Sequence, residues 1–153
     1  MSSQPSSRPD ASTAEATATL IAALDRTVET VVAKASARTN QGREIDAHQP
    51  VAERVAYFAT EVRAAKCLAE YASGEGSSEP YIGDMALVFA AEMASKAAGQ
   101  LDVRTEPPAA EGSPPKVSPI AMPELVQQLA RAREAEAAGR GRVASFLAEL
   151  ASV

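Results

Sequence analysis

The stretch VAERVAYFATEVRAAKCLAEYA, residues 51–72, decides the fold. Its apolar residues recur at alternating steps of four and three, which is the period of one face of an α-helix. They are Val51, Val55, Phe58, Val62, Ala65, Ala69 and Ala72. Pro50 suits a first helical turn, and Gly74 follows the last apolar position. The pattern therefore predicts a helix that begins at Pro50 and ends before Gly74.

The same spacing recurs on both sides of this stretch. The further helices that it predicts cover residues 12–37, 80–102 and 124–152. In the helix over 80–102, the expected apolar side consists of Ile82, Met85, Val88, Phe89, Met93, Ala97 and Leu101. The last segment keeps one phase past Gly139 and Gly141, so it is either one long helix or two short ones.

Composition divides the chain into parts. Six prolines between Arg104 and Pro123 exclude a regular element and predict an extended linker. The N-terminus is rich in Ser and Pro, which predicts disorder. The predicted parts are a tail over 1–11, a helical domain over 12–103, the linker over 104–123 and a C-terminal helical segment over 124–153.

Charge and cysteine content exclude several function classes. A net charge of −5 disfavours a nucleic-acid surface, which needs clustered Lys and Arg. No apolar run approaches the roughly 20 residues that span a membrane, and the N-terminus lacks the apolar core of a secretion signal. Because Cys67 and His48 are single, no intrachain disulfide and no zinc site of the usual type is expected. We therefore expect a cytoplasmic protein without metal.

The predicted fold class is all-α, an antiparallel bundle of three long helices with a C-terminal helical segment. Short connections between successive helices favour antiparallel neighbours. Alanine favours helix strongly but buries little area, so three helices rarely cover so much Ala surface. For this reason we expect a homo-oligomer or another protein partner.

Residues 38–49, RTNQGREIDAHQ, connect the first two predicted helices. Their residue pattern is more distinctive than a connecting turn requires. The spacing Arg38-x-x-Gln41-Gly42-x-x-Ile45-x-x-x-Gln49 resembles the R-x-x-F-G-x-x-I-x-x-x-Q signature of the acyl-CoA dehydrogenase family. The resemblance extends over the flanking helices, and DMALVFAAEMASKAAGQL, residues 84–101, looks like the third helix of the family's C-terminal helical domain. It covers roughly residues 20–101, with spacing and order in agreement.

The resemblance implies a cofactor contact. In the family this corner touches FAD, typically the FAD of a neighbouring subunit. Carried over by position, Arg38 would pair with the FAD phosphates or face its adenosine, Gln49 would supply an amide, and Gly42 would supply the tight turn. Gln41 occupies the position where the family has Phe, so the aromatic surface on which the cofactor could stack or pack is lost. A plainer interpretation of Arg38 is a contact with the C-terminal dipole of the first helix.

The sequence also departs from the family. It shows no covering β-domain, no Gly-Gly FAD loop and no catalytic Glu after Leu101. Glu15 or Glu29 could be offered as a base, but neither aligns convincingly, so no catalytic residue is assigned. Two functions remain. The first is a non-catalytic oligomerisation or interaction subunit. The second is the small subunit of a split FAD-dependent acyl-CoA dehydrogenase, whose corner would contact the FAD of a flavoprotein partner.

Overall fold

The computed structural model describes residues 11–79, 81–100 and 123–152. Across these ranges the chain forms helices and turns and no strand, so the all-α prediction is confirmed. The elements are α1 (Ala11–Arg38), η1 (Ile45–His48), α2 (Gln49–Ser73), η2 (Glu75–Ser78), α3 (Ile82–Gln100) and α4 (Pro123–Ala151), where η marks a short 3-10 helix. None of the described helices is long and apolar enough to cross a membrane.

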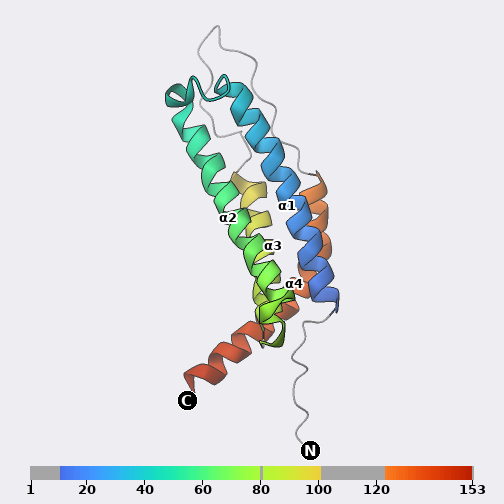
Figure 1. The fold of residues 1–153 in the computed structure, drawn as a ribbon. Helices are drawn as coiled ribbons and strands as arrows, with labels where there is room; N and C mark the ends of the chain where they lie inside the picture. The colour runs from blue at the N-terminus through green and yellow to red at the C-terminus, as the bar shows by residue number, and fades with distance from the viewer. Residues whose placement is uncertain (1–10, 80, 101–122, 153) are drawn as a thin grey trace, which may run out of the picture.

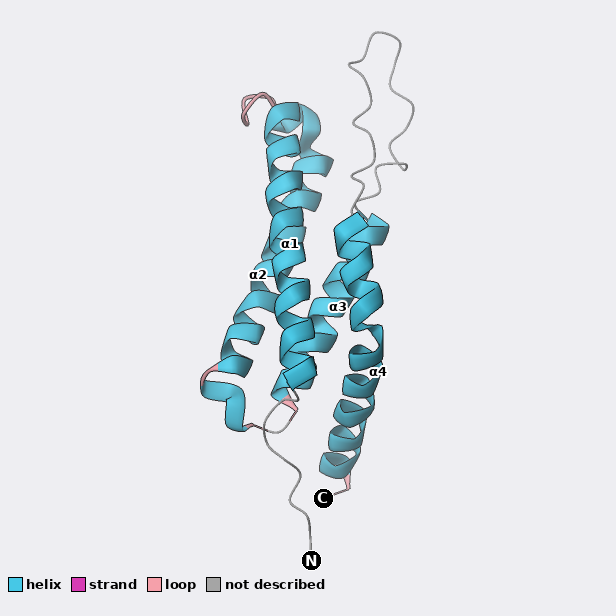
Figure 2. Ribbon diagram, turned by 90° about the vertical axis from the view of Figure 1, so that its right-hand side faces the viewer, coloured by secondary structure: helices cyan, strands magenta, loops and turns pink. Residues whose placement is uncertain are grey.

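Successive helices run antiparallel, as the short connections predicted (Figure 1). The helices α1 and α3 pack against each other, and both also contact α2 and α4. They therefore lie between α2 on one side and α4 on the other (Figure 2). The helix α4 thus adds a fourth member to the bundle of three long helices that the sequence predicted.

The hairpin of α1 and α2 extends beyond the ends of α3 and α4 (Figures 1 and 2). Its length follows from the chain, because α1 and α2 have 28 and 25 residues whereas α3 has 19. The connection between α1 and α2 lies at the tip of this projection. The fold therefore presents residues 38–49 away from the packed part of the bundle.

The apolar seam of α2 lies in the core, as its spacing predicted. Phe58 is 5% exposed, and Val62 and Ala65 are also buried. They pack in one cluster with Leu20 and Leu24 of α1. Since the seam is covered within its own chain, a second copy of the protein would have to bind through another surface.

On α3, the core face matches the predicted apolar side only in part: Met93 and Ala97 are buried as predicted, but other members are not. The side chains of Leu87, Ala90 and Ala94 are fully buried, whereas Met85 is 42% exposed. The larger residues Val88 and Phe89 are half-buried at the edge of the core. Close contact with α1, α2 and α4 requires small residues along the centre of α3, so alanines take the positions that size alone would assign to Val and Phe.

The segment after the linker is one continuous helix, which resolves the alternative of one or two helices. Its predicted phase is confirmed at Leu125 and Ala132, which are buried, and at Gly139. A Cβ on Gly139 would lie 3.6 Å from Cβ of Asp84, so α4 approaches α3 closely there. Leu150, at the far end of the predicted stripe, is 58% exposed.

Two predicted segments lie largely outside the described residues, namely the tail over 1–11 and the linker over 104–123. Of these segments, only Ala11 and Pro123 are described, and both belong to helices. The helix α3 begins at Ile82, two residues after the predicted start. Tyr81, directly before it, has φ 68°, a left-handed conformation that cannot be part of a right-handed helix.

Candidate functional site

The corner, residues 38–49, contains three consecutive residues in the left-handed region. Asn40, Gln41 and Gly42 have φ angles of 49°, 57° and 89°. The Gln41 backbone N–H donates to the carbonyl oxygen of Ser36 at 2.8 Å, which satisfies one of the free carbonyls at the end of α1. The chain therefore reverses direction within a few residues, and Gly42 lies in the tight turn.

The hydroxyl of Thr39 holds this turn together. Thr39 is 4% exposed; its Oγ1 donates to the Ala35 carbonyl at 2.9 Å and accepts from the Gly42 N–H at 3.2 Å. The Thr39 carbonyl in turn accepts the Glu44 N–H at 2.9 Å. Thr39 is not among the residues whose spacing identified the corner. The signal that could have found it is a threonine at a helix end, where its hydroxyl can bond to the backbone.

Asn40 is a second residue of the turn that the spacing does not include. It follows α1 in the left-handed conformation that Asn tolerates better than most residues. Its Nδ2 donates to Oε1 of Glu44 at 3.1 Å, across the turn. Thr39 and Asn40 therefore shape the corner, although neither belongs to the spacing that identified it.

The four residues assigned to cofactor binding lie at one end of the α1–α2 hairpin. Arg38 is the last residue of α1 and is half-buried, and Gln49 is the first residue of α2. Gln41, Gly42 and Gln49 are exposed. A Cβ on Gly42 would meet no atom within 4 Å, so the turn is open on that side.

The corner carries side chains that can bind an anion or a polar group. A guanidinium at Arg38 can pair with phosphate oxygens, and the amide of Gln49 can donate and accept hydrogen bonds. The described parts of α3 and α4 do not reach the corner, so neither helix packs beside it (Figures 1 and 2). The corner is therefore not covered by the described parts of these two helices.

The carboxylates that could be offered as a base are not at the corner. Glu15 and Glu29 are exposed residues of α1. At 1.5 Å rise per residue they lie about 35 and 14 Å along the helix axis from Arg38. No group of three or more His, Cys, Asp or Glu in the described part of the chain could hold a metal ion.

Cys67 is exposed on α2, although the stretch around it is largely apolar. Ala65 and Ala69 on either side of it face the core, and a residue two positions from each turns about 200° away from them.

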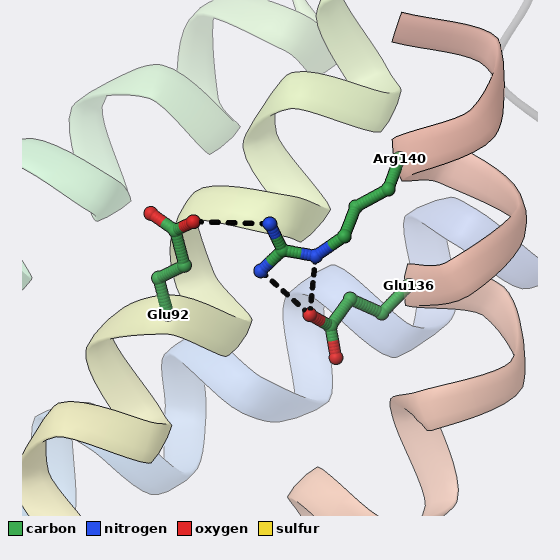
Figure 3. Close-up of polar contacts among 3 residues, drawn as sticks. All are labelled: Glu92, Glu136 and Arg140. Carbon is green, nitrogen blue, oxygen red and sulfur yellow. Dashed lines mark hydrogen bonds and ion pairs between the residues drawn. The ribbon is translucent and has the colours of Figure 1, made fainter. Parts of the chain in front are cut away.

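A second polar cluster joins α4 to α3. Arg142 forms two hydrogen bonds with Asp84, from Nε to Oδ2 at 2.7 Å and from Nη2 to Oδ1 at 2.5 Å. Arg140 pairs with Glu136 on its own helix and with Glu92 on α3 (Figure 3). The hydrogen bonds that Arg140 donates to Glu136 and Glu92 raise the pKa of Arg140 above its usual value. These residues are used in packing one helix onto another.

Comparison with protein families finds a match over more than half of the chain. The family described as "Acyl-CoA dehydrogenase, C-terminal domain" matches residues 13–102. The match includes α1, the corner, α2 and α3, and α4 lies outside it. Searches of curated proteins and of solved structures returned no match.

Proposed function

The chain belongs to the acyl-CoA dehydrogenase C-terminal domain family, and from this premise we propose that it is a non-catalytic interaction subunit. The placement of Glu15 and Glu29 carries this proposal. Dehydrogenation of an acyl-CoA needs a carboxylate base beside the substrate's α-carbon and a covered flavin. Both carboxylates are exposed on α1 and distant from the corner.

Activity measurements test the proposal. Purified protein, supplied with FAD and a panel of acyl-CoA substrates, should reduce no electron acceptor, while a complete acyl-CoA dehydrogenase assayed in parallel should do so. Turnover that follows the protein through successive purification steps and increases with its concentration would overturn the non-catalytic role.

A second function is supported by the position of the corner at the tip of the hairpin. The corner is accessible there to another chain, so the protein could serve as the small subunit of a split flavoenzyme, with FAD shared between two chains. If this second function is correct, the purified complex with the flavoprotein partner should be yellow, because it would contain bound FAD.

A matched pair of arginine variants separates the two functions. If Arg38 contacts FAD, Arg38→Ala should weaken binding of FAD or of the flavoprotein by about 1.5–3 kcal/mol, the range of charge-assisted hydrogen bonds. Arg43→Ala removes an exposed arginine from the same corner and is the control. Equal affinities for wild type and both variants, measured by flavin absorbance or calorimetry, would favour the interaction subunit and exclude the cofactor contact.

A further inference from the structure

The last turns of α4 project beyond the other helices (Figures 1 and 2). We call residues 142–152 the arm. Earlier in the same helix Leu125 and Ala132 are buried, whereas no residue from Arg140 to Ser152 is buried. The arm is therefore the part of α4 that the core holds least.

The arm keeps an apolar face where the core no longer covers it. Val143, Phe146, Leu147 and Leu150 follow one another at the spacing of one helical face. Leu150 lies about seven helical turns from the buried Leu125, so this face continues the one with which α4 packs on the bundle. Leu147 and Leu150 are 57% and 58% exposed, and Val143 and Phe146 are half-buried.

A polar contact connects the arm to the start of α3. Asp84 lies in the first turn of α3, and its side chain is 9% exposed. It accepts two hydrogen bonds from Arg142, and a Cβ on Gly139 would lie 3.6 Å from its own Cβ. Loss of Arg142 would leave a nearly buried carboxylate without these bonds, which is unfavourable. This contact therefore favours an arm that is docked on α3.

An aromatic contact lies one turn further along the arm. The rings of Phe146 and Tyr81 have centroids 4.6 Å apart and planes inclined by 35°. Tyr81 has φ 68°, a left-handed conformation that is unfavourable for a residue with a Cβ. Such a conformation persists only where the surrounding structure holds it, and the ring of Phe146 is part of those surroundings. The docked arm is therefore associated with backbone strain at Tyr81.

The backbone at the start of the arm is easily deformed. Gly139 and Gly141 lie on either side of Arg140, and glycine lowers helix propensity relative to alanine. A Cβ on Gly141 would meet no atom within 4 Å. The two glycines and the strain at Tyr81 favour release of the arm, whereas the contacts with Asp84 and with the Tyr81 ring favour docking. Opposed effects of this kind leave two states close in free energy.

We propose that the arm is a conformational switch. In its docked state Arg142 binds Asp84 and Phe146 stacks on Tyr81; in its released state both contacts are broken and Tyr81 leaves the left-handed region. Release frees Phe146 and exposes the whole apolar face of the arm. The start of α3 therefore controls how much apolar surface this end of the molecule presents. The inference goes beyond the proposed function and does not depend on it.

Amide hydrogen exchange of the full chain, followed by mass spectrometry, tests the switch. In wild type, residues 142–152 should exchange at least about tenfold faster than residues 124–138 of the same helix, but more slowly than an unstructured peptide of the same sequence. Equal rates in the two parts of α4 would overturn the proposal, because the arm would not open separately. Exchange at the rate of the free peptide would also overturn it, because the docked state would not be populated.

Two variants test the docking contacts. Phe146→Ala and Asp84→Asn should each accelerate exchange of the arm about tenfold, because each removes a contact that only the docked state makes. Leu147→Ala, at an exposed site on the arm, is the matched control and should leave the rate unchanged. Unchanged rates in Phe146→Ala and Asp84→Asn would show that the end of α4 frays without these contacts having a role, and would overturn the proposal.

Gly141→Ala should act in the opposite direction, so misfolding cannot imitate its effect. Alanine favours the helix that the docked arm completes, and exchange of the arm should slow about two- to fivefold. An unchanged or faster rate would contradict a deformable start of the arm.

The backbone scalar coupling of Tyr81, measured by NMR, tests the link between release and strain. In wild type and in Leu147→Ala it should report the positive φ of the docked state. In Phe146→Ala it should report a negative φ, because the ring that holds Tyr81 is gone. A positive φ that persists in Phe146→Ala while the arm exchanges rapidly would overturn the switch, since Tyr81 would not respond to release.

Discussion

At the scale of single residues, the backbone of the corner shows where side-chain identity matters. Asn40, Gln41 and Gly42 all occupy the left-handed region, and only glycine does so without a steric cost from Cβ. The left-handed backbone at position 42 therefore favours glycine whether or not a cofactor binds at the corner. The two glycines in the middle of α4 have no such backbone requirement.

Gly42→Ala should lower the free energy of unfolding by about 1 kcal/mol. The cost comes from the left-handed backbone alone, because the added Cβ meets no atom within 4 Å. Gly141→Ala is the matched change: its Cβ also meets nothing within 4 Å, but the site is helical, so the variant should gain about 0.5–1 kcal/mol. Urea unfolding of the two variants measures both signs. Shifts in the same direction would contradict the backbone argument.

Phe58→Ala should cost about 3–5 kcal/mol, because the ring is buried in the centre of the bundle. Leu147→Ala, at a site 57% exposed, is the control and should change stability by less than about 0.5 kcal/mol. Thermal or urea unfolding gives both values. If Phe58→Ala melted with wild type, the assignment of the α2 seam to the core would be wrong.

At the scale of the elements, ion pairs connect neighbouring helices. Lys66 of α2 binds Asp25 of α1 at 2.6 Å, Lys96 of α3 binds Glu61 of α2, and Arg142 of α4 binds Asp84 of α3. Most of these side chains are about one-third exposed or more, so water screens their attraction. Asp84 differs, because its side chain is 9% exposed.

Asp84→Ala should therefore lower stability by about 1.5–3 kcal/mol, since it removes two hydrogen bonds to a charged group at a nearly buried site. Glu92→Ala removes an acceptor of similar kind whose side chain is 49% exposed, and it should cost less than about 1 kcal/mol. Amide hydrogen exchange should report the loss of protection mainly in α4. Equal costs for the two variants would show that burial does not set the strength of these pairs.

The pair of Lys66 and Asp25 makes a pH-dependent contribution. The hydrogen bond to Asp25 raises the pKa of Lys66 above its usual 10.5, so the folded state holds this proton more tightly than the unfolded state. The stabilisation is fully present below pH 10.5 and is lost as the pH rises through the folded-state pKa. The difference in Tm between wild type and Lys66→Met should therefore shrink above that pH. A difference that is constant from neutral to alkaline pH would contradict the linkage.

At the scale of the whole molecule, α4 belongs to the same core as the three helices that match the family. Leu125 is 1% exposed and packs in the cluster that contains Phe58 of α2. Arg140, Arg142 and Gly139 add contacts to α3 further along the helix. From these contacts we expect the helices α1 to α4 to unfold as one cooperative unit.

Leu125→Ala should therefore cost about 2–5 kcal/mol and shift the unfolding of the entire molecule. Hydrogen exchange in α2, which α4 does not flank, should accelerate together with exchange in α4. Val126→Ala, one residue away at a site 52% exposed, is the control. Loss of protection confined to α4 would show that this helix unfolds separately.

The sequence by itself determined the helical class, the four helical segments, the phase of α2 and the position of the corner. These features are local, because a period of 3.6 and the Gly and Pro signals at helix ends depend on neighbouring residues. The tertiary structure decided which side of α3 faces the core, where Cys67 points and how α4 packs on α1 and α3. In helices so rich in alanine, several faces are nearly equal in hydrophobicity. The approach of distant segments, such as Gly139 to Asp84, therefore selects the face that is buried.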